Sequence, residues 1–289
     1  INIYINSNNM NFITGEKIQF LCDHFIGHTK DFRFNPNVNK NYKDKCINIE
    51  SINDVINNKL LIFCYTHLID KLDFLISKLT YLKNPFILIF HNSDADFNNK
   101  HLILFDKLHL LQSVYTQNMN VINPKVLPLP IGLGNSQWKH GNLKVINEIY
   151  NLKIPKLKNI YFNFQKSTNV NKRNDCYDNI LKLGISWAKK KPYHEYLRFL
   201  KQHKYAICPE GNGIDTHRFW ECLYMNVIPI CKKNILVQHY SKYFPIIIVD
   251  EWSDINIDKL ITTYKENVNF INHNLLDLHS LPLFMLTNK

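Results

Sequence analysis

The stretch that most constrains the fold covers residues 204–231 and reads KYAICPEGNGIDTHRFWECLYMNVIPIC. Residues 205–208 predict a short strand, which Pro209 ends because proline removes a ladder donor and fixes φ. Two glycines then bend the backbone into a loop. Apolar residues at spacings of three and four predict a helix after the loop, and the run at 227–230 predicts a second buried strand. The stretch is therefore a strand, a glycine loop, a helix and a strand.

The helix in this stretch has recognisable start and stop signals. Asp215 or Thr216 is expected to be its N-cap, because a short polar side chain accepts a hydrogen bond from a first-turn amide. Asn226 is the expected stop of this helix. The glycine loop then lies at the carboxyl end of a strand and at a helix N-terminus, where α/β sheets commonly bind anions such as phosphate.

Two charged residues in this helix have two interpretations. Arg218, in the first turn, opposes the helix dipole and is unfavourable there unless an anion is bound beside it. Glu221 follows one turn later, and a carboxylate can accept hydrogen bonds from two adjacent ribose hydroxyls. In the alternative interpretation the two residues form an ordinary i,i+3 surface pair worth roughly 0.2 to 0.5 kcal/mol. His217 is interpreted as an ordinary solvated residue.

The segment CPEGNGIDTHRFWE, followed by an apolar run with IP, resembles the donor-binding motif of exostosin-like glycosyltransferases. It is similar, more loosely, to the corresponding segment of α1,3-fucosyltransferases. Both families have the GT-B fold, so the resemblance implies an α/β protein with two Rossmann-like domains whose parallel sheets face each other across a cleft. The resemblance covers the chain from about Leu60 onward and is densest in the opening stretch.

The same resemblance implies site residues. Arg218 would hold the donor diphosphate and Glu221 would approach the ribose. Asn226 and Val227 stand where the family has Gly-Cys, and the spacing from Glu210 to Glu221 departs from the Glu-x7-Glu of many retaining enzymes, so retention or inversion stays open. The residues that would line the sugar and phosphate pocket are Glu210, Gly211, Asn212, Gly213 and Thr216.

Polar side chains also follow an apolar strand expected at residues 86–90. The sequence there is HNSDAD, and strand carboxyl ends face the binding side of an α/β sheet. His91, Asp94 or Asp96 is a candidate base for deprotonating an acceptor hydroxyl, with no principled choice among them. The alternative is that this stretch only caps the next turn through side-chain to backbone hydrogen bonds.

Apolar strands and amphipathic helices alternate along the chain, which predicts parallel sheets. We expect two domains, an acceptor domain over 1–145 and a donor domain over 146–289, the second opening with a strand at 159–164. Arg173 follows that strand and either reaches the donor phosphates or is a helix surface charge. Near the amino end we expect, in order, a strand at 1–5, a helix at 16–25 and a surface loop at 30–46.

The composition of the chain limits the kinds of ligand and the compartments that suit this protein. A net charge of +11 suits phosphorylated ligands. The lysines are scattered along the chain, and their short run at 189–191 is expected to be a solvated face rather than a nucleic-acid groove. No apolar run approaches the roughly 20 residues that span a bilayer. Seven cysteines without a CxxC pair argue against a disulfide framework and a zinc site and favour the cytoplasm or another reducing compartment. A further domain in a longer chain is expected, because the sequence lacks an initiator methionine.

The resemblance to these transferases implies a hexosyl- or pentosyltransferase of glycan biosynthesis. The donor would be a UDP- or GDP-sugar and the acceptor a glycan or glycoconjugate hydroxyl. No metal ion or other cofactor is demanded, since Arg218 and the helix amides can neutralise the leaving diphosphate, although Asp94-Ala95-Asp96 has the spacing of a DxD metal motif. The alternatives are a non-catalytic nucleotide- or glycan-binding module and a basic nucleic-acid binder, whose affinity would fall steeply with salt.

Overall fold

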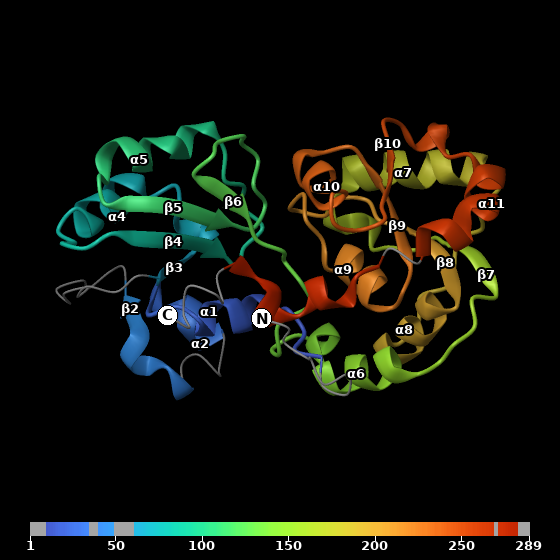
Figure 1. Ribbon diagram of the computed structural model, residues 1–289, viewed down its shortest axis with the longest axis horizontal. Coiled ribbons are helices and arrows are strands. Elements are labelled where there is room, and N and C mark those ends of the chain that lie inside the picture. Colours follow the sequence, from blue (N-terminus) through green and yellow to red (C-terminus); the bar gives the residue numbers. More distant parts are fainter. Residues whose placement is uncertain (1–9, 35–39, 49–60, 269–270, 283–289) are drawn as a thin grey trace. The chain divides into compact units, whose positions relative to one another are not determined.

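The computed structural model describes residues 10–34, 40–48, 61–268 and 271–282, so the strand expected at 1–5 lies outside the described residues. The fold is α/β with two parallel sheets, one of six strands and one of four (Figure 1). Each sheet belongs to its own compact unit: residues 14–131 form one, and residues 1–13 with 132–289 form the other. The cleft expected between the sheets stays a prediction.

The six-stranded sheet has the order β2-β1-β3-β4-β5-β6, and every neighbouring pair is parallel. Its central strands are apolar and buried along their whole length, as expected for a sheet covered on both faces. The strands are β1 (His24–Gly27), β2 (Cys46–Asn48), β3 (Leu61–Tyr65), β4 (Phe86–His91), β5 (Leu111–Thr116) and β6 (Val126–Pro128).

The amino-terminal part of this unit differs from the sequence expectation. The helix expected over 16–25 ends at Phe20, and β1 begins at His24 because it pairs with strands on both sides. The loop expected over 30–46 contains helical turns, so that prediction is also wrong in part. The helices are α1 (Gly15–Phe20), α2 (Thr29–Phe34), α4 (Leu72–Leu79), α5 (Ile103–Lys107) and the 3-10 turns η1 (Lys43–Lys45), η2 (Thr66–Leu68) and η3 (Asn99–Leu102).

The four-stranded sheet has the order β10-β9-β8-β7, and its strands follow one another across the second unit in Figure 1. All three pairs are parallel. The strand of this sheet that comes first in the sequence, β7, therefore lies at one edge of the sheet. The strands are β7 (Lys158–Tyr161), β8 (His203–Ile207), β9 (Ile228–Lys232) and β10 (Ile247–Val249).

The helix expected after the glycine loop is α9, and polar side chains mark the ends of two helices in this unit. Asn169 caps α7 by accepting a hydrogen bond from the Lys172 amide, and Asn226 stops α9 in the left-handed conformation, with φ of 55°. The helices are α6 (Leu143–Asn151), α7 (Val170–Lys182), α8 (Tyr193–Lys201), α9 (His217–Tyr224), α10 (Ile235–Tyr240) and α11 (Ile257–Val268), and the 3-10 turns are η4 (Lys139–Gly141), η5 (Lys166–Thr168), η6 (Trp252–Asp254), η7 (His273–Leu276) and η8 (Leu278–Ser280).

Residues 10–13 pack with the later part of the chain. The Asn11 amide donates to Oδ2 of Asp277 at 3.0 Å, and the Ile13 amide donates to the Tyr224 hydroxyl at 3.0 Å. Gly132 has φ of 65°, and a Cβ there would lie 2.4 Å from the Ile13 carbonyl oxygen, so glycine is required at this crossing. The units divide at 131 and 132, earlier than the domain boundary expected at 145 and 146, which falls inside α6.

All seven cysteines are free thiols. In the part of the chain that the structure describes, no helix combines the length and the apolar character needed to cross a membrane.

Candidate functional site

The β8–α9 loop has the local structure that its sequence predicts, with a different capping arrangement. Thr216 occupies the N-cap position in extended conformation, but its side chain makes no capping hydrogen bond. Instead, Oδ1 of Asp215 accepts from the Thr216 amide at 2.8 Å and from Nε1 of Trp220 at 2.9 Å. Asp215 therefore closes the loop onto the body of α9, and the first turn of the helix has no side-chain cap.

Arg218 lies against aromatic rings at the start of α9. Its guanidinium carbon is 5.2 Å from the centre of the Tyr161 ring and 4.7 Å from that of Tyr196. Nη1 donates to the Asn163 carbonyl at 2.7 Å, and Nε lies 3.6 Å from Oε2 of Glu221. The i,i+3 pair is therefore present, but it is not a surface pair, because the side chains of Arg218 and Glu221 are only 21% and 7% exposed.

Glu221 is occupied on both carboxylate oxygens. The Tyr193 hydroxyl donates to Oε1 at 3.0 Å, and the Tyr196 hydroxyl donates to Oε2 at 2.6 Å. Burial and the adjacent carboxylate raise the pKa of both tyrosines, so both hydroxyls stay protonated donors. Glu221 thus helps to hold Arg218 and both tyrosines in place. The ribose interpretation needs two free carboxylate oxygens, and both oxygens of Glu221 are already bonded.

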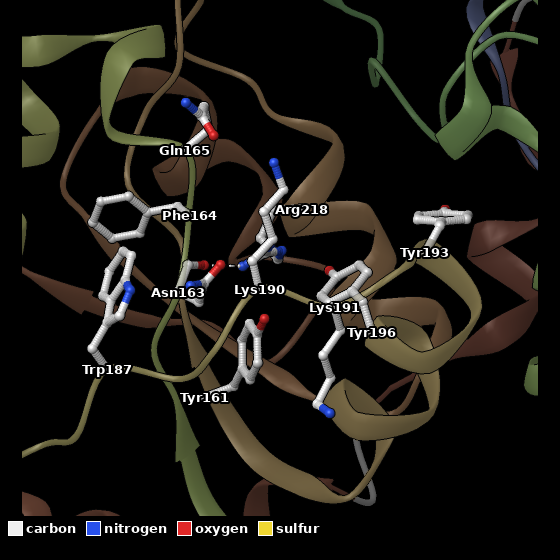
Figure 2. Close-up of a pocket in the computed structure, with 10 residues that line it drawn as sticks. All are labelled: Tyr161, Asn163, Phe164, Gln165, Trp187, Lys190, Lys191, Tyr193, Tyr196 and Arg218. Atoms are coloured by element: carbon white, nitrogen blue, oxygen red, sulfur yellow. Dashed lines mark hydrogen bonds between the residues drawn. The ribbon is translucent and has the colours of Figure 1, made fainter.

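A pocket of about 460 Å³ opens in front of these residues, beyond the carboxyl end of β7. Figure 2 shows Phe164 and Trp187 on one side of it, Tyr193 on the other and Arg218 between them. The pocket combines aromatic faces with cations, a lining suited to a ligand that carries both a flat ring and negative charge. The lining residues are Tyr161, Asn163, Phe164, Gln165, Trp187, Lys190, Lys191, Tyr193, Tyr196 and Arg218.

The sequence analysis missed most of this pocket. The lysine run 189–191 was expected to be a solvated face, yet Lys190 and Lys191 line the pocket. The two tyrosines that bind Glu221 come from α8, where they are three residues apart and share one helical face. That spacing was the available signal, but the contact joins α8 to α9, and such tertiary pairing is not visible in a single sequence.

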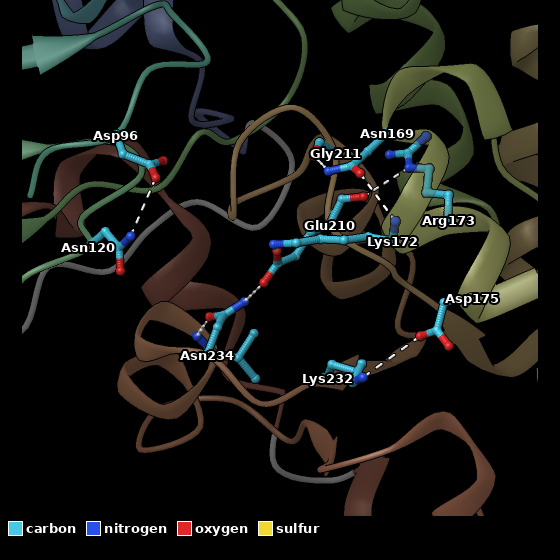
Figure 3. Close-up of polar contacts among 11 residues, drawn as sticks. Asp96, Asn120, Asn169, Lys172, Arg173, Asp175, Glu210, Gly211, Lys232 and Asn234 are labelled. Atoms are coloured by element: carbon cyan, nitrogen blue, oxygen red, sulfur yellow. Dashed lines mark hydrogen bonds and ion pairs between the residues drawn. The ribbon is translucent and has the colours of Figure 1, made fainter.

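Arg173 and the glycine loop form a second polar group, drawn in Figure 3. Nε of Arg173 donates to the Glu210 carbonyl at 2.9 Å, and Nη1 donates to the Gln165 carbonyl at 2.6 Å. Burial and the nearby charge of Arg218 lower the pKa of the Arg173 guanidinium. Arg173 therefore joins the loop to a pocket residue, Gln165, and brings a second cation close to Arg218.

The loop itself is held at both of its ends. Side chains of Lys172 and Asn234 bind the two carboxylate oxygens of Glu210, the amide of Asn234 at 2.8 Å (Figure 3). Nδ2 of Asn169 donates to the Gly211 carbonyl at 2.8 Å, and the Gly211 amide donates to the Gly213 carbonyl at 3.1 Å. Asn212 is the exposed tip of this loop. The loop is thus preformed, with Asn212 projecting outward from it.

His217 is more constrained than an ordinary solvated residue. Its Nδ1 lies 2.8 Å from the Gly132 carbonyl oxygen, to which it must donate, because a carbonyl only accepts. The His217 ring lies 5.6 Å from the ring of His140, centre to centre. Burial, together with the neighbouring His217, lowers the pKa of His140. The imidazole at the start of α9 therefore has a defined orientation.

The candidate base residues lie in the other unit, at the carboxyl end of β4. His91 is only 1% exposed, its Nε2 lies 3.1 Å from the Pro130 carbonyl oxygen, and its Nδ1 accepts from the Asn92 amide at 2.8 Å. A histidine with both nitrogens bonded in the interior has a structural role, so the structure argues against His91 as the base. Asp94 is exposed, and Asp96 accepts from Nδ2 of Asn120 at 3.4 Å (Figure 3).

A network of amide side chains holds this second loop. Nδ2 of Asn92 donates to Oε1 of Gln19 at 3.0 Å, and Nε2 of Gln117 donates to the Ser93 carbonyl at 3.0 Å. The Ala95 amide donates to the Ser93 hydroxyl at 3.3 Å, which is the local cap expected as the alternative. The loop after β4 is therefore rigid at its base, and Asp94 projects from it.

Within the residues that the structure describes, no group of three or more His, Cys, Asp or Glu side chains is arranged to hold a metal ion.

Comparison with known proteins gives a weak structural likeness. A crystal structure of an α1,3-fucosyltransferase matches with 14% identity and a TM-score of 0.39, covering 93% of this chain and 80% of that one. No protein-family model matches the sequence, and no curated protein matches it either. A TM-score of this size carries no argument about activity, and the exostosin-like resemblance stays a prediction.

Proposed function

We propose that this protein is a glycosyltransferase that moves a sugar from a nucleotide diphosphate donor to an acceptor hydroxyl. The observation that carries the proposal is the pocket of about 460 Å³ in front of Arg218. It follows the carboxyl end of a parallel strand, the usual ligand position in α/β sheets. Its volume lies within the usual range for small-molecule sites.

Each part of the donor has a matching part of the pocket. The diphosphate binds Arg218, with Lys190 and Lys191 supplying further positive charge. The nucleobase of the donor stacks on the aromatic side of the pocket formed by Phe164 and Trp187. The centres of these two rings are 5.1 Å apart, in edge-to-face geometry. Arg218 contacts Glu221, and two tyrosine hydroxyls in turn hold the Glu221 carboxylate, so the position of Arg218 is set before the ligand binds. Such preorganised charge stabilises a leaving diphosphate without a metal ion.

The acceptor is activated at the carboxyl edge of the six-stranded sheet. A base there takes the hydroxyl proton, the hydroxyl oxygen bonds to the anomeric carbon, and the bond from that carbon to the diphosphate breaks. Asp94 and Asp96 remain candidates for the base, and His91 does not, because of its burial. The acceptor is a glycan or glycoconjugate, and the sugar is a hexose or pentose.

A binding module without catalysis is the second candidate. The observation that favours it is Glu221, whose side chain is buried and whose two carboxylate oxygens are already bonded, so it offers no free oxygen to a donor ribose. The two functions differ in turnover: a module binds the nucleotide sugar and releases no nucleoside diphosphate beyond the uncatalysed rate.

Calorimetric titration of UDP, GDP and a panel of their sugars tests the donor site. Arg218→Lys should weaken binding of the diphosphate by about tenfold or more, because an ammonium keeps the charge and loses the planar fork that binds two oxygens. Arg198→Lys is the matched control, since Arg198 is exposed on α8 and lies outside the pocket lining. A parent protein that binds neither nucleotide, or an Arg218→Lys variant that binds like the parent, contradicts the proposed donor site.

A further inference from the structure

A second cluster of chemistry-bearing side chains lies in the unit of residues 14–131, next to the loop after β4. Strands β1 and β3 are parallel neighbours, so the segments that follow them leave the same edge of the sheet. After β1 come His28 and then α2, which carries Asp31, and after β3 the chain enters η2, which carries His67. Since β4 pairs in parallel with β3, Asp94 emerges from this edge as well.

The contact at the centre of this cluster joins an imidazole to a carboxylate. Nε2 of His67 lies 3.1 Å from Oδ1 of Asp31, and Oδ2 of Asp31 accepts from the His28 amide at 2.8 Å. The Asp31 side chain is 10% exposed and that of His67 is 38% exposed. The carboxylate is therefore largely enclosed, while the imidazole reaches solvent.

The geometry determines which nitrogen of His67 carries the proton. A carboxylate accepts hydrogen bonds only, so Nε2 is the donor, and in the neutral ring the lone pair lies on Nδ1. Among the described residues, Nδ1 of His67 has no hydrogen-bond partner. An imidazole held in one tautomer by a carboxylate, with its other nitrogen not bonded to the protein, is the arrangement that general bases use.

The charges around the pair keep Asp31 ionised. Burial raises the pKa of Asp31, but hydrogen bonds from His67 and from the His28 amide outweigh it, and the pKa is lowered overall. Besides His67, the titratable groups that interact with Asp31 are His28, which precedes α2, and Cys64 and Tyr65 of β3. Nζ of Lys71 donates to Nε2 of His28 at 3.2 Å. An ionised Asp31 stabilises the imidazolium that forms when His67 takes a proton.

We infer that His67, oriented by Asp31, is the general base that deprotonates the acceptor hydroxyl. The inference rests on the proposed transferase function. The acceptor proton moves to Nδ1 of His67, the oxygen electron pair bonds to the anomeric carbon, and the carbon–oxygen bond to the diphosphate breaks, so that its electrons leave with the nucleoside diphosphate. At neutral pH an imidazole is ordinarily a stronger base than a carboxylate, which favours this pair over an exposed aspartate.

The test compares His67→Gln with Asp94→Asn and the parent. Transfer is measured as nucleoside diphosphate released from a panel of UDP- and GDP-sugars with methyl glycosides as acceptors. His67→Gln should lower kcat by about 100-fold or more and remove the acid limb of the parent's pH–rate profile, because glutamine can keep the hydrogen bond to Asp31 but cannot take a proton. Donor affinity by calorimetry should stay unchanged in both variants. Loss of the acid limb in Asp94→Asn, with the limb kept in His67→Gln, overturns the inference.

Asp31→Asn provides an independent variant. It should also lower kcat while leaving donor affinity intact, because the amide no longer fixes the imidazole tautomer or its charge. If the pair only tied α2 to η2, either variant would lower the unfolding midpoint and leave kcat unchanged. Transfer by His67→Gln within about threefold of the parent overturns the inference.

A measurement without any variant covers the case in which the substitutions prevent folding. Diethyl pyrocarbonate should modify His67 in the parent, and loss of transfer should follow carbethoxylation of the His67 peptide by mass spectrometry. Transfer that survives full modification at His67 overturns the inference alone. A parent that binds the nucleotide sugar and transfers nothing overturns the proposed function, and this inference with it.

Discussion

The carboxyl edges of the two sheets have the same backbone geometry and opposite chemistry. At the four-stranded edge, cations and aromatic rings line an open pocket, and Glu210 and Glu221 are bonded to neighbouring side chains. At the carboxyl ends of the six-stranded sheet, amide side chains hold the loop after β4 in place, and Asp94 in that loop is exposed. Parallel strands therefore supply a location, and the residues that follow each strand decide whether the location receives an anion or a proton.

The difference also concerns rigidity. The four-stranded edge positions one charge, Arg218, by means of a buried carboxylate and two phenols. The six-stranded edge positions a whole loop by neutral hydrogen bonds and tight backbone contact at Gly15. Perturbing the first should act mainly through charge, and perturbing the second mainly through packing.

The largest effect is expected from Glu221→Gln. Removing this carboxylate leaves Arg218 in a largely enclosed position without its anion, which should lower the free energy of unfolding by about 3 kcal/mol. Urea unfolding measures the change. Glu195→Gln is the matched control, because the Lys191–Glu195 pair is 3.8 Å long and Glu195 is 60% exposed, so its loss should cost less than about 0.5 kcal/mol. Equal losses would show that burial does not distinguish the two pairs.

Gly15→Ala should have the next largest effect. A Cβ at Gly15 would lie 1.9 Å from Oδ1 of Asn92 and 2.7 Å from Nδ1 of His91, so the loop after β4 must shift, at a cost of about 1 to 3 kcal/mol. At the carboxyl ends of the four-stranded sheet, a Cβ at Gly211 would lie 3.3 Å from Nη2 of Arg173, a much longer contact, and Gly211→Ala should cost less. Unfolding midpoints of both variants check the ranking, and a reversed order would contradict the difference in rigidity.

Acid should weaken the four-stranded unit through His203. Burial lowers the pKa of His203 to about 4, and its Nδ1 donates to the Phe199 carbonyl at 2.7 Å. Between the ordinary histidine value of about 6.5 and that value, the unfolded chain binds the extra proton, so stability falls as the pH falls, by up to about 1.4 kcal/mol per pH unit. Urea unfolding at several pH values gives the free energy of unfolding as a function of pH. This free energy should change less steeply with pH in His203→Gln than in the parent. An unchanged slope would contradict the assignment.

The smallest effect is expected from Asp96→Asn. The contact from Asn120 to Asp96 is 3.4 Å long and exposed, and its loss should change the free energy of unfolding by less than about 0.5 kcal/mol. Transfer should also stay near the parent rate. A stable Asp96→Asn protein that has lost transfer by about 100-fold would instead identify Asp96 as the base.

Local sequence signals predicted the backbone of the β8–α9 loop. Pro209 and Asn226 act through their own φ preferences, and these preferences do not depend on distant residues. The strand–loop–helix–strand order of residues 204–231 is therefore confirmed. The same reasoning overextended the helix near residue 20, because β1 is fixed by pairing with β2 and β3 rather than by its own four residues.

The side-chain constellations could not be predicted in the same way. Tyr193 and Tyr196 meet Glu221 across 28 and 25 residues of chain, and His67 meets Asp31 across two strands of the sheet. Such contacts follow from helix packing and sheet order, which a single sequence does not contain. Arg218 was noticed because its charge conflicts with the helix dipole locally, and the partners that resolve this conflict were not.

The division of the chain into units has a consequence for the order of folding. Residues 14–131 are contiguous, so that unit can complete its sheet while the ribosome is still synthesising the remainder. The other unit encloses it in sequence, and the contacts of Asn11 with Asp277 and with Leu278 close a loop of more than 260 residues. Because ordering so long a loop is entropically costly and slow, these contacts should form last during biogenesis, and the unit that contains the pocket should be completed after the six-stranded sheet.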